Sequence, residues 1–175
     1  GVIPQGTPIE ADRFIYPRVE QEIAFLLAHD LKGPVVTAAD VIAATRGVMP
    51  AVEIVDRRWG FQGTTFADAI ADNGSFGAII FGAALYPLEG IDLRRVGVYT
   101  LQNGELVSSG TAVEVLDDPV NAVCWLANRL IGDGEYLRAG DIILSGSITA
   151  AIPAIRGDSF HIAYTYLGDI DLRFI

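Results

Sequence analysis

The chain has 175 residues, of which 51% are hydrophobic and 19% charged, so it is long enough for one domain with a substantial core. Acidic residues outnumber basic ones by 22 to 12, and the net charge of −10 argues against binding to nucleic acid or to anionic membranes. A single cysteine, Cys124, excludes an intramolecular disulfide and multi-cysteine metal sites, and favours a cytoplasmic location.

The first half of the chain is predicted to form strands and short helices in alternation after an irregular start over residues 3–12. Each predicted strand is a short run rich in Val, Ile or Phe, and Thr37 can act as the N-cap of the first helix. The predicted strands are residues 19–28, 51–55 and 76–81, and the predicted helices are residues 38–45 and 64–71. For residues 19–28 a helix is the competing interpretation, because Glu, Ala and Leu are good helix formers. Gly47 is expected to end the first helix.

The second half is predicted to be mostly strands with one longer helix. Asn103-Gly104 is the strongest hairpin signal, and Pro119 marks the first residue of an amphipathic helix that continues through Leu130. Gly168-Asp169 is the expected turn between the last two strands. The predicted strands are residues 96–102, 105–109, 141–144, 159–166 and 170–175. The whole pattern predicts one compact domain over residues 1–175, mostly of strands with two or three short helices.

Three carboxylates are the sharpest chemical feature. In a strand, Glu20 and Glu22 project from one face with Cα atoms about 6.5–7 Å apart, and Glu53 interrupts an otherwise apolar strand. Like charges held this close favour a proton or a cation, and carboxylates without softer ligands suit Mg²⁺ or Mn²⁺. The alternative is a solvated strand face on which the glutamates pair with Arg13 or Arg18.

Other polar residues are weaker candidates. Ser75, with Asp72 in the preceding turn, is predicted to contact a substrate carboxylate or the surroundings of the metal. Thr149 is a further candidate because it lies in a loop after a buried strand. An ordinary turn is the alternative at both places. We interpret His29, His161 and Cys124 as structural residues.

At these residues the sequence resembles a known family. The segment YPRVEQEIA over residues 16–24 is similar to the metal motif of the fumarylacetoacetate hydrolase superfamily. The similarity is closer to the branch of 2-hydroxypenta-2,4-dienoate hydratases (2-keto-4-pentenoate hydratases) and 4-oxalocrotonate decarboxylases. In that branch a third Glu follows about thirty residues later, which here is Glu53. Further matches run to the C-terminus, at residues 71–75, 107–110, 118–127, 140–146 and 157–160.

The resemblance implies a fold and a function. The fold is α+β, mostly β: a mixed β-roll or distorted barrel with short peripheral helices. The implied function is metal-dependent hydration of 2-hydroxypenta-2,4-dienoate to 4-hydroxy-2-oxopentanoate in aromatic-compound catabolism. The implied protein is a cytoplasmic homo-oligomer, in complex with a pathway aldolase or decarboxylase in some members. Motifs of both branch members occur here: residues 108–110 and 121–127 look more like hydratases, and residues 148–153 more like decarboxylases.

One departure from the family bears on catalysis. Family members carry an additional N-terminal region with a catalytic lysine, and these residues contain no counterpart. Lys32, the one lysine in the sequence, lies in a Gly-Pro turn after the metal motif. The general acid–base residue is therefore not assigned. Three alternatives stay open: a 4-oxalocrotonate decarboxylase, an acylpyruvate-type C–C hydrolase, and a non-catalytic partner subunit.

Overall fold

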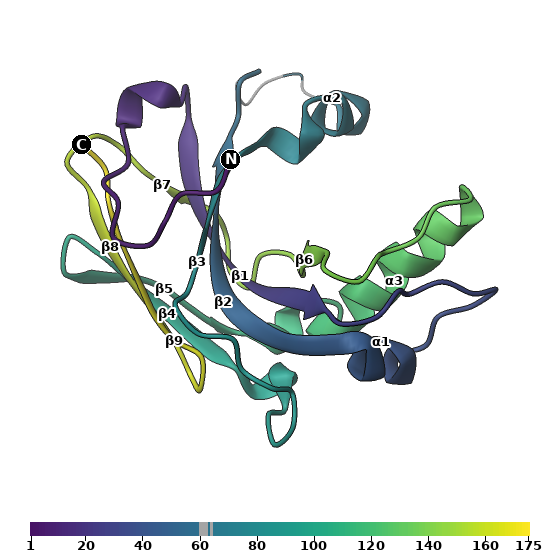
Figure 1. Cartoon of the computed structure of the whole chain (residues 1–175). Helices are drawn as coiled ribbons and strands as arrows, with labels where there is room; N and C mark the ends of the chain where they lie inside the picture. The colour runs from purple at the N-terminus through teal and green to yellow at the C-terminus, as the bar shows by residue number, and fades with distance from the viewer. Residues whose placement is uncertain (60–62, 64) are drawn as a thin grey trace.

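Two antiparallel β-sheets form the body of the protein in a computed structural model that describes residues 1–59, 63 and 65–175 (Figure 1). The strands are β1 Pro17–Leu27, β2 Thr45–Asp56, β3 Phe76–Phe81, β4 Gly97–Gln102, β5 Glu105–Thr111, β6 Ile142–Leu144, β7 Ile152–Pro153, β8 Ser159–Tyr164 and β9 Gly168–Arg173. The first sheet has the order β3-β2-β1-β6, with β7 also paired to β1, and the second has the order β5-β4-β8-β9.

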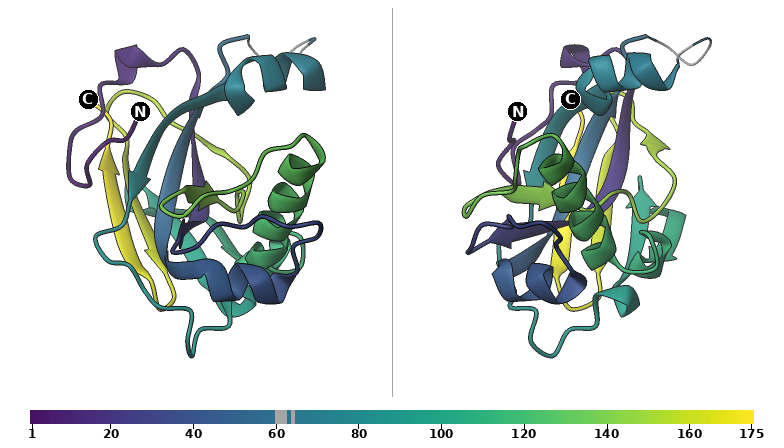
Figure 2. Two further views of the ribbon diagram at one scale, coloured as in Figure 1. Left: turned by 45° about the vertical axis from the view of Figure 1, so that its right-hand side comes forward. Right: turned by 90° about the vertical axis from the view of Figure 1, so that its right-hand side faces the viewer.

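The helices lie at the periphery of these sheets (Figure 2). They are α1 Ala38–Ala44, α2 Phe66–Ala71 and α3 Pro119–Gly132, together with the short 3₁₀ turns η1 Ala11–Arg13, η2 Asn73–Ser75, η3 Leu93–Arg95 and η4 Ala112–Glu114. The predicted α+β, mostly β fold with short peripheral helices is confirmed. Among the described residues, none of the helices is both long and apolar enough to cross a membrane.

The central feature is the long antiparallel pair of β1 and β2. Strand β1 is paired with β2 along its whole length and with β6 and β7 on its other edge. The helix interpretation of residues 19–28 is therefore wrong. The segment is a strand, as its alternating pattern predicts, because both of its edges are hydrogen-bonded and both of its faces are largely covered. Val19, Ile23 and Phe25 are fully buried on one face, and Glu20 and Glu22 lie on the other.

The main hydrophobic core lies between the two sheets and draws on β1, β2, β4, β8 and β9. The Tyr164 hydroxyl on β8 crosses this core and donates a hydrogen bond of 2.7 Å to the carbonyl of Ala51 on β2. A second, smaller cluster around Ala24, Ala51 and Ile79 lies on the other face of the first sheet. Side chains therefore cover the first sheet from both faces, and its second face is the one that carries the glutamates.

Two predicted boundaries are wrong for identifiable reasons. Helix α1 ends at Ala44, and Gly47 lies inside β2, where a Cβ atom would stand 2.7 Å from the carbonyl oxygen of Tyr86. Gly47 is thus required by a close approach of two backbones. In the sequence, such a glycine looks the same as one that ends a helix. The last turn is also earlier than predicted, because Gly168 already pairs with Tyr164.

The other predicted helices and strands are present with shifted ends, the largest shift being in the strand predicted over residues 51–55, which extends over residues 45–56 as β2. Thr65 caps α2 through a reciprocal pair of hydrogen bonds with Asp68, while Thr64, the first residue of the predicted helix, lies outside the described residues. The side chain of Asp118 caps α3, with Pro119 as the first helical residue. The two-residue strand β7 was not predicted, because a run this short carries no periodic signal.

Candidate functional site

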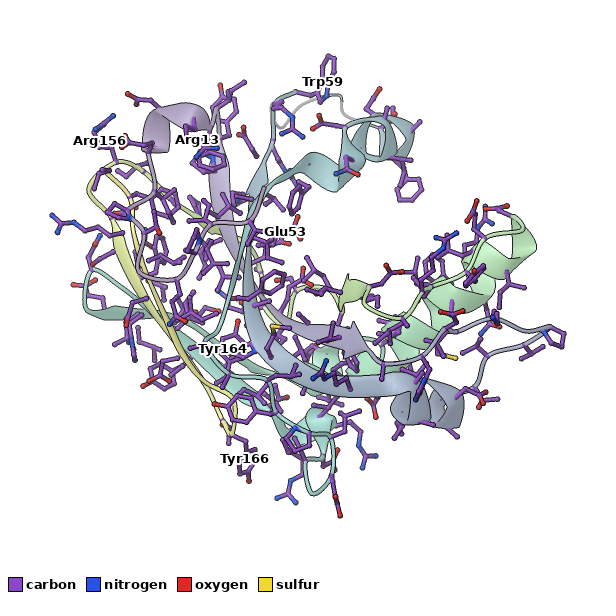
Figure 3. The ribbon with its side chains drawn as sticks, in the orientation of Figure 1. Arg13, Glu53, Trp59, Arg156, Tyr164 and Tyr166 are labelled. Atoms are coloured by element: carbon purple, nitrogen blue, oxygen red, sulfur yellow. The ribbon has the colours of Figure 1, made fainter. Side chains whose placement is uncertain are left out.

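The register of β1 and β2 brings the three predicted glutamates together. Glu20 is directly opposite Glu53, and Glu22 follows two residues later on the same face of β1. One carboxylate oxygen from each residue lies within 4.8 Å of the other two. Figure 3 shows Glu53 on the side of the first sheet that faces away from Tyr164 and the second sheet. The cluster therefore lies outside the main core.

Burial and mutual repulsion make these carboxylates hard to ionise. Glu22 is only 3% exposed, and burial, reinforced by the charges of Glu53 and Glu20, raises its pKa to about 8. A hydrogen bond of 2.8 Å from the amide of Gly146 to Glu22 Oε2 opposes this rise. Burial also raises the pKa of Glu53 to about 7, with the charge of Glu20 as the next cause. The cluster therefore holds protons near neutral pH unless a cation replaces them.

The pKa of Glu20 is raised less than the pKa values of Glu22 and Glu53. Burial raises its pKa, but the guanidinium groups of Arg57 and Arg18 lower it. This difference arises because the strand end near Glu20 carries positive charge, whereas Glu22 lies deeper in the sheet.

The donor set can be tested against a hard divalent cation. The three groups offer only carboxylate oxygens, which are the ligands that Mg²⁺ and Mn²⁺ prefer. Burial, with the charges of the neighbouring glutamates as a further cause, raises the pKa values of Glu22 and Glu53, and a divalent cation would stabilise their ionised forms. Three protein ligands leave coordination positions for water and for substrate oxygens. The chemistry of the cluster therefore suits Mg²⁺ or Mn²⁺.

A cavity of about 500 Å³ opens beside the cluster. Its lining includes charged, hydroxyl and aromatic side chains, among them Glu20, Glu53, Arg57, Trp59, Phe66 and Ser75. Arg57 is not among the predicted site residues, although it continues the two-residue spacing from Glu53 through Val55. Trp59 and Phe66 were not predicted either; they are 70% and 82% exposed and lie outside the regular part of either sheet. The cavity is thus acidic at the strands and aromatic toward α2.

The predicted substrate residues lie in different places. Ser75 lines the same cavity as Glu20 and Glu53. Asp72 lies in the turn just before it, where its carboxylate accepts a hydrogen bond of 2.7 Å from Arg58 Nε. The structure therefore brings Ser75 to the cavity beside the glutamates, whereas Asp72 pairs with Arg58 in the preceding turn and does not line the cavity.

Thr149 lies on the other side of β1. Its hydroxyl donates a short hydrogen bond to Gln21 Oε1, and the Gln21 side chain points to the face opposite Glu20 and Glu22. Thr149 also lines a different cavity, together with Ser108 and Ser109 of β5. A direct contact between Thr149 and a ligand at the glutamates stays a prediction.

The other titratable candidates have local partners. Lys32 pairs with Asp30 at 3.0 Å and lies over the ring of Tyr136. His161 Nδ1 is 2.9 Å from Asp171 on the neighbouring strand β9. These interactions agree with the structural interpretation of His161.

Comparison with known proteins identifies the family. The sequence profile described as Fumarylacetoacetate (FAA) hydrolase C-terminal matches residues 1–174, so the chain belongs to this family. The 2-oxo-hept-4-ene-1,7-dioate hydratase of Escherichia coli is 40% identical over 97% of this chain and 66% of its own length. The 2-keto-4-pentenoate hydratase 1 of Dechloromonas aromatica is 36% identical over 98% of this chain and 65% of its own length.

A solved structure agrees with the fold in detail. The 4-oxalocrotonate decarboxylase from Pseudomonas putida G7, complexed with magnesium and adipate, superposes with a TM-score of 0.95 at 38% identity. The match covers 99% of this chain and 66% of the decarboxylase chain. The chain thus spans just under two thirds of the length of these relatives.

The raised carboxylate pKa values predict an unusual pH dependence of stability. Between the ordinary pKa of 4.5 and the folded value of about 8, Glu22 keeps a proton that the unfolded chain releases. Unfolding therefore releases protons in this range, and the stability of the metal-free protein should fall as pH rises from 5 to 8.5. Thermal melts in EDTA measure this fall.

The matched variant is Glu22→Gln, which removes the titrating group at nearly constant volume. Its melting temperature should change less over the same pH range than that of the unaltered protein. Excess Mg²⁺ should remove the fall in the unaltered protein, because the cation takes the place of the proton. Equal slopes for the two proteins in EDTA would contradict the assignment of a raised pKa to Glu22.

Proposed function

We propose that the protein is a divalent-metal-dependent hydro-lyase that hydrates 2-hydroxypenta-2,4-dienoate to 4-hydroxy-2-oxopentanoate, in aromatic-compound catabolism. The observation that carries the proposal is the convergence of Glu20, Glu22 and Glu53 beside a cavity that Ser75 also lines. Two relatives at 36% and 40% identity are named as hydratases of related acids, which supports the reaction class.

The three glutamates are proposed to hold one Mg²⁺ or Mn²⁺. A relative's structure contains magnesium, which supports a divalent cation in this family. When bound, such an ion supplies Lewis-acid polarisation of a 2-oxo acid. The protein's own contribution is rigidity: Glu20 and Glu53 are fixed by direct pairing of β1 and β2, and the Gly146 amide fixes one oxygen of Glu22.

The cavity residues are proposed to orient the substrate. Ser75 is positioned to donate a hydrogen bond to the substrate carboxylate, and Arg57 adds positive charge on the same wall. Trp59 and Phe66 offer apolar surface to the diene and exclude water from part of its length. Asp72 and Thr149 remain proposals as substrate contacts.

Decarboxylation of 4-oxalocrotonate is the second candidate. A decarboxylase structure at 38% identity supports it, at nearly the same identity as the hydratase of Escherichia coli at 40%. The two reactions differ in what is lost or gained: the hydratase adds water across the distal double bond, and the decarboxylase releases CO₂. Acylpyruvate hydrolysis has weaker support, because the fumarylpyruvate hydrolase structure is only 15% identical and shares the fold alone.

The assembly is a separate proposal that rests on the family resemblance. We propose that the protein forms a homo-oligomer and that it associates with a pathway aldolase or decarboxylase. A non-catalytic subunit of such a complex would bind the metal without turnover, so the activity measurement below also separates this alternative.

The metal site predicts the behaviour of Glu53→Gln. The unaltered protein should bind about one equivalent of Mn²⁺, and the variant should bind it at least about tenfold more weakly, because one of three charged ligands is lost. Isothermal titration with Mn²⁺ measures both. Glu105→Gln, on exposed β5, is the matched control and should bind like the unaltered protein. Equal Mn²⁺ affinity in Glu53→Gln would contradict the site.

The activity prediction concerns rate and product. No general acid–base group is assigned among the described residues, so the 175-residue chain should consume the dienoate at least about 10²-fold more slowly than the Dechloromonas aromatica hydratase. Loss of the dienoate's ultraviolet absorbance measures the rate, and NMR of the product separates hydration from decarboxylation of 4-oxalocrotonate. Turnover should require Mg²⁺ or Mn²⁺ and should be lost in Glu53→Gln. Consumption that is independent of metal and of Glu53 would contradict the proposed function.

A further inference from the structure

The turn that carries Ser75 has an unusual backbone. Asn73, Gly74 and Ser75 have φ angles of 54°, 67° and 63°, so three consecutive residues are left-handed. Glycine adopts this conformation freely and asparagine tolerates it, but serine is disfavoured in it. Ser75 must therefore be held in place by its surroundings.

A single guanidinium group brackets this turn. Arg58 Nε donates a hydrogen bond of 2.7 Å to Asp72 Oδ1, and Arg58 Nη2 donates one of 3.0 Å to the Asp72 carbonyl. On the other side of the turn, Arg58 Nη1 donates one of 3.2 Å to the carbonyl of Phe76. The three bonds tie together the residues that directly precede and follow the left-handed segment.

The same contacts connect the turn to the strand of the metal ligands. Arg58 lies two residues after the end of β2, which carries Glu53. The Asp72 carbonyl that accepts from Arg58 also accepts a hydrogen bond of 3.0 Å from the amide of Ser75. Ser75 is thus linked to β2 in two ways: through Arg58, which follows that strand in the chain, and through Phe76, which pairs with Val55 of β2.

The ion pair is more enclosed than a comparable Arg–Asp pair elsewhere on the protein. The Asp72 side chain is 12% exposed and the Arg58 side chain 35%, whereas the comparable pair Arg94–Asp92 is 38% exposed at Asp92 and 57% at Arg94. The hydrogen bond to Asp72 also raises the pKa of Arg58 above its ordinary value. A fork of three donors matches three acceptors here, which lysine cannot reproduce.

We propose that Arg58 and Asp72 are positioning residues that hold the left-handed turn and thereby aim Ser75 into the cavity beside the glutamates. This inference rests on the proposed function for the ligand that Ser75 meets. It assigns to Asp72 a role through Ser75 in place of a direct contact with substrate.

A double-mutant cycle tests the link to ligand binding. The probe is oxalate, a chelating dianion, titrated into Mn²⁺-loaded protein. Ser75→Ala and Asp72→Asn should each weaken oxalate binding by about tenfold. The double variant should bind oxalate at most about twofold more weakly than either single variant. Arg58→Lys should resemble Asp72→Asn. Mn²⁺ affinity should be unchanged in all of them, which excludes general misfolding.

Additive losses in the double variant would overturn the inference, because Asp72 would then act independently of Ser75. Native oxalate affinity in Asp72→Asn or in Arg58→Lys would overturn it equally. Asp92→Asn is the matched control: it breaks a similar short-range Arg–Asp pair that lies outside the lining of this cavity and should leave oxalate affinity unchanged.

A second measurement needs no metal or ligand. The hydrogen-exchange rate of the Ser75 amide is measured by NMR. It should rise by about tenfold or more in Asp72→Asn and stay unchanged in Asp92→Asn, because the contacts of Arg58 with Asp72 hold the carbonyl to which the Ser75 amide donates. An unchanged rate in Asp72→Asn would overturn the inference. Failure of the unaltered protein to bind Mn²⁺ would instead contradict the proposed function. The exchange rate of the Ser75 amide would still decide whether Arg58 and Asp72 hold the turn.

Discussion

Three carboxylates share one face of an antiparallel strand pair, and the burial of their negative charge is the constraint on which the site depends. Direct pairing of Glu20 with Glu53 fixes their separation, and Glu22 follows at the two-residue spacing of the strand. Burial raises the pKa of Glu22 to about 8, so the cluster needs protons or a cation at neutral pH. The register cannot slip by one residue without moving the glutamates into the main core.

The rest of the fold keeps this register in place. The second sheet packs its core side chains against the back of β1 and β2, and Tyr164 adds a buried hydrogen bond to Ala51. The Gly146 amide reaches Glu22 from the loop after β6. On the cavity side, Arg58 ties the end of β2 to the turn of Ser75. The proposed metal ligands and the proposed substrate contact therefore lie on elements that are connected directly.

Much of this arrangement follows from the sequence, and the exceptions have physical causes. Alternation in β1 and the isolated Glu53 predicted a carboxylate cluster because both signals are local. Gly47 was misread because a glycine that permits close backbone approach looks the same in sequence as one that ends a helix. Thr149 and Asp72 were grouped with Ser75 because sequence does not show which side of a strand or turn a polar residue occupies. Arg57 continues the two-residue spacing of Glu53 and could have been found from it, but Trp59 and Phe66 meet the cavity only through long-range packing, which no local pattern encodes.

The central claim is that the strand register gathers Glu20, Glu22 and Glu53 around one divalent cation. The most direct measurement is the anomalous difference map of a crystal soaked in Mn²⁺. The account predicts one strong peak per chain within coordination distance of a carboxylate oxygen from each of the three residues, with oxygen ligands completing its coordination shell. A map without a peak at these residues, or with its main peak held by other side chains, would contradict the account.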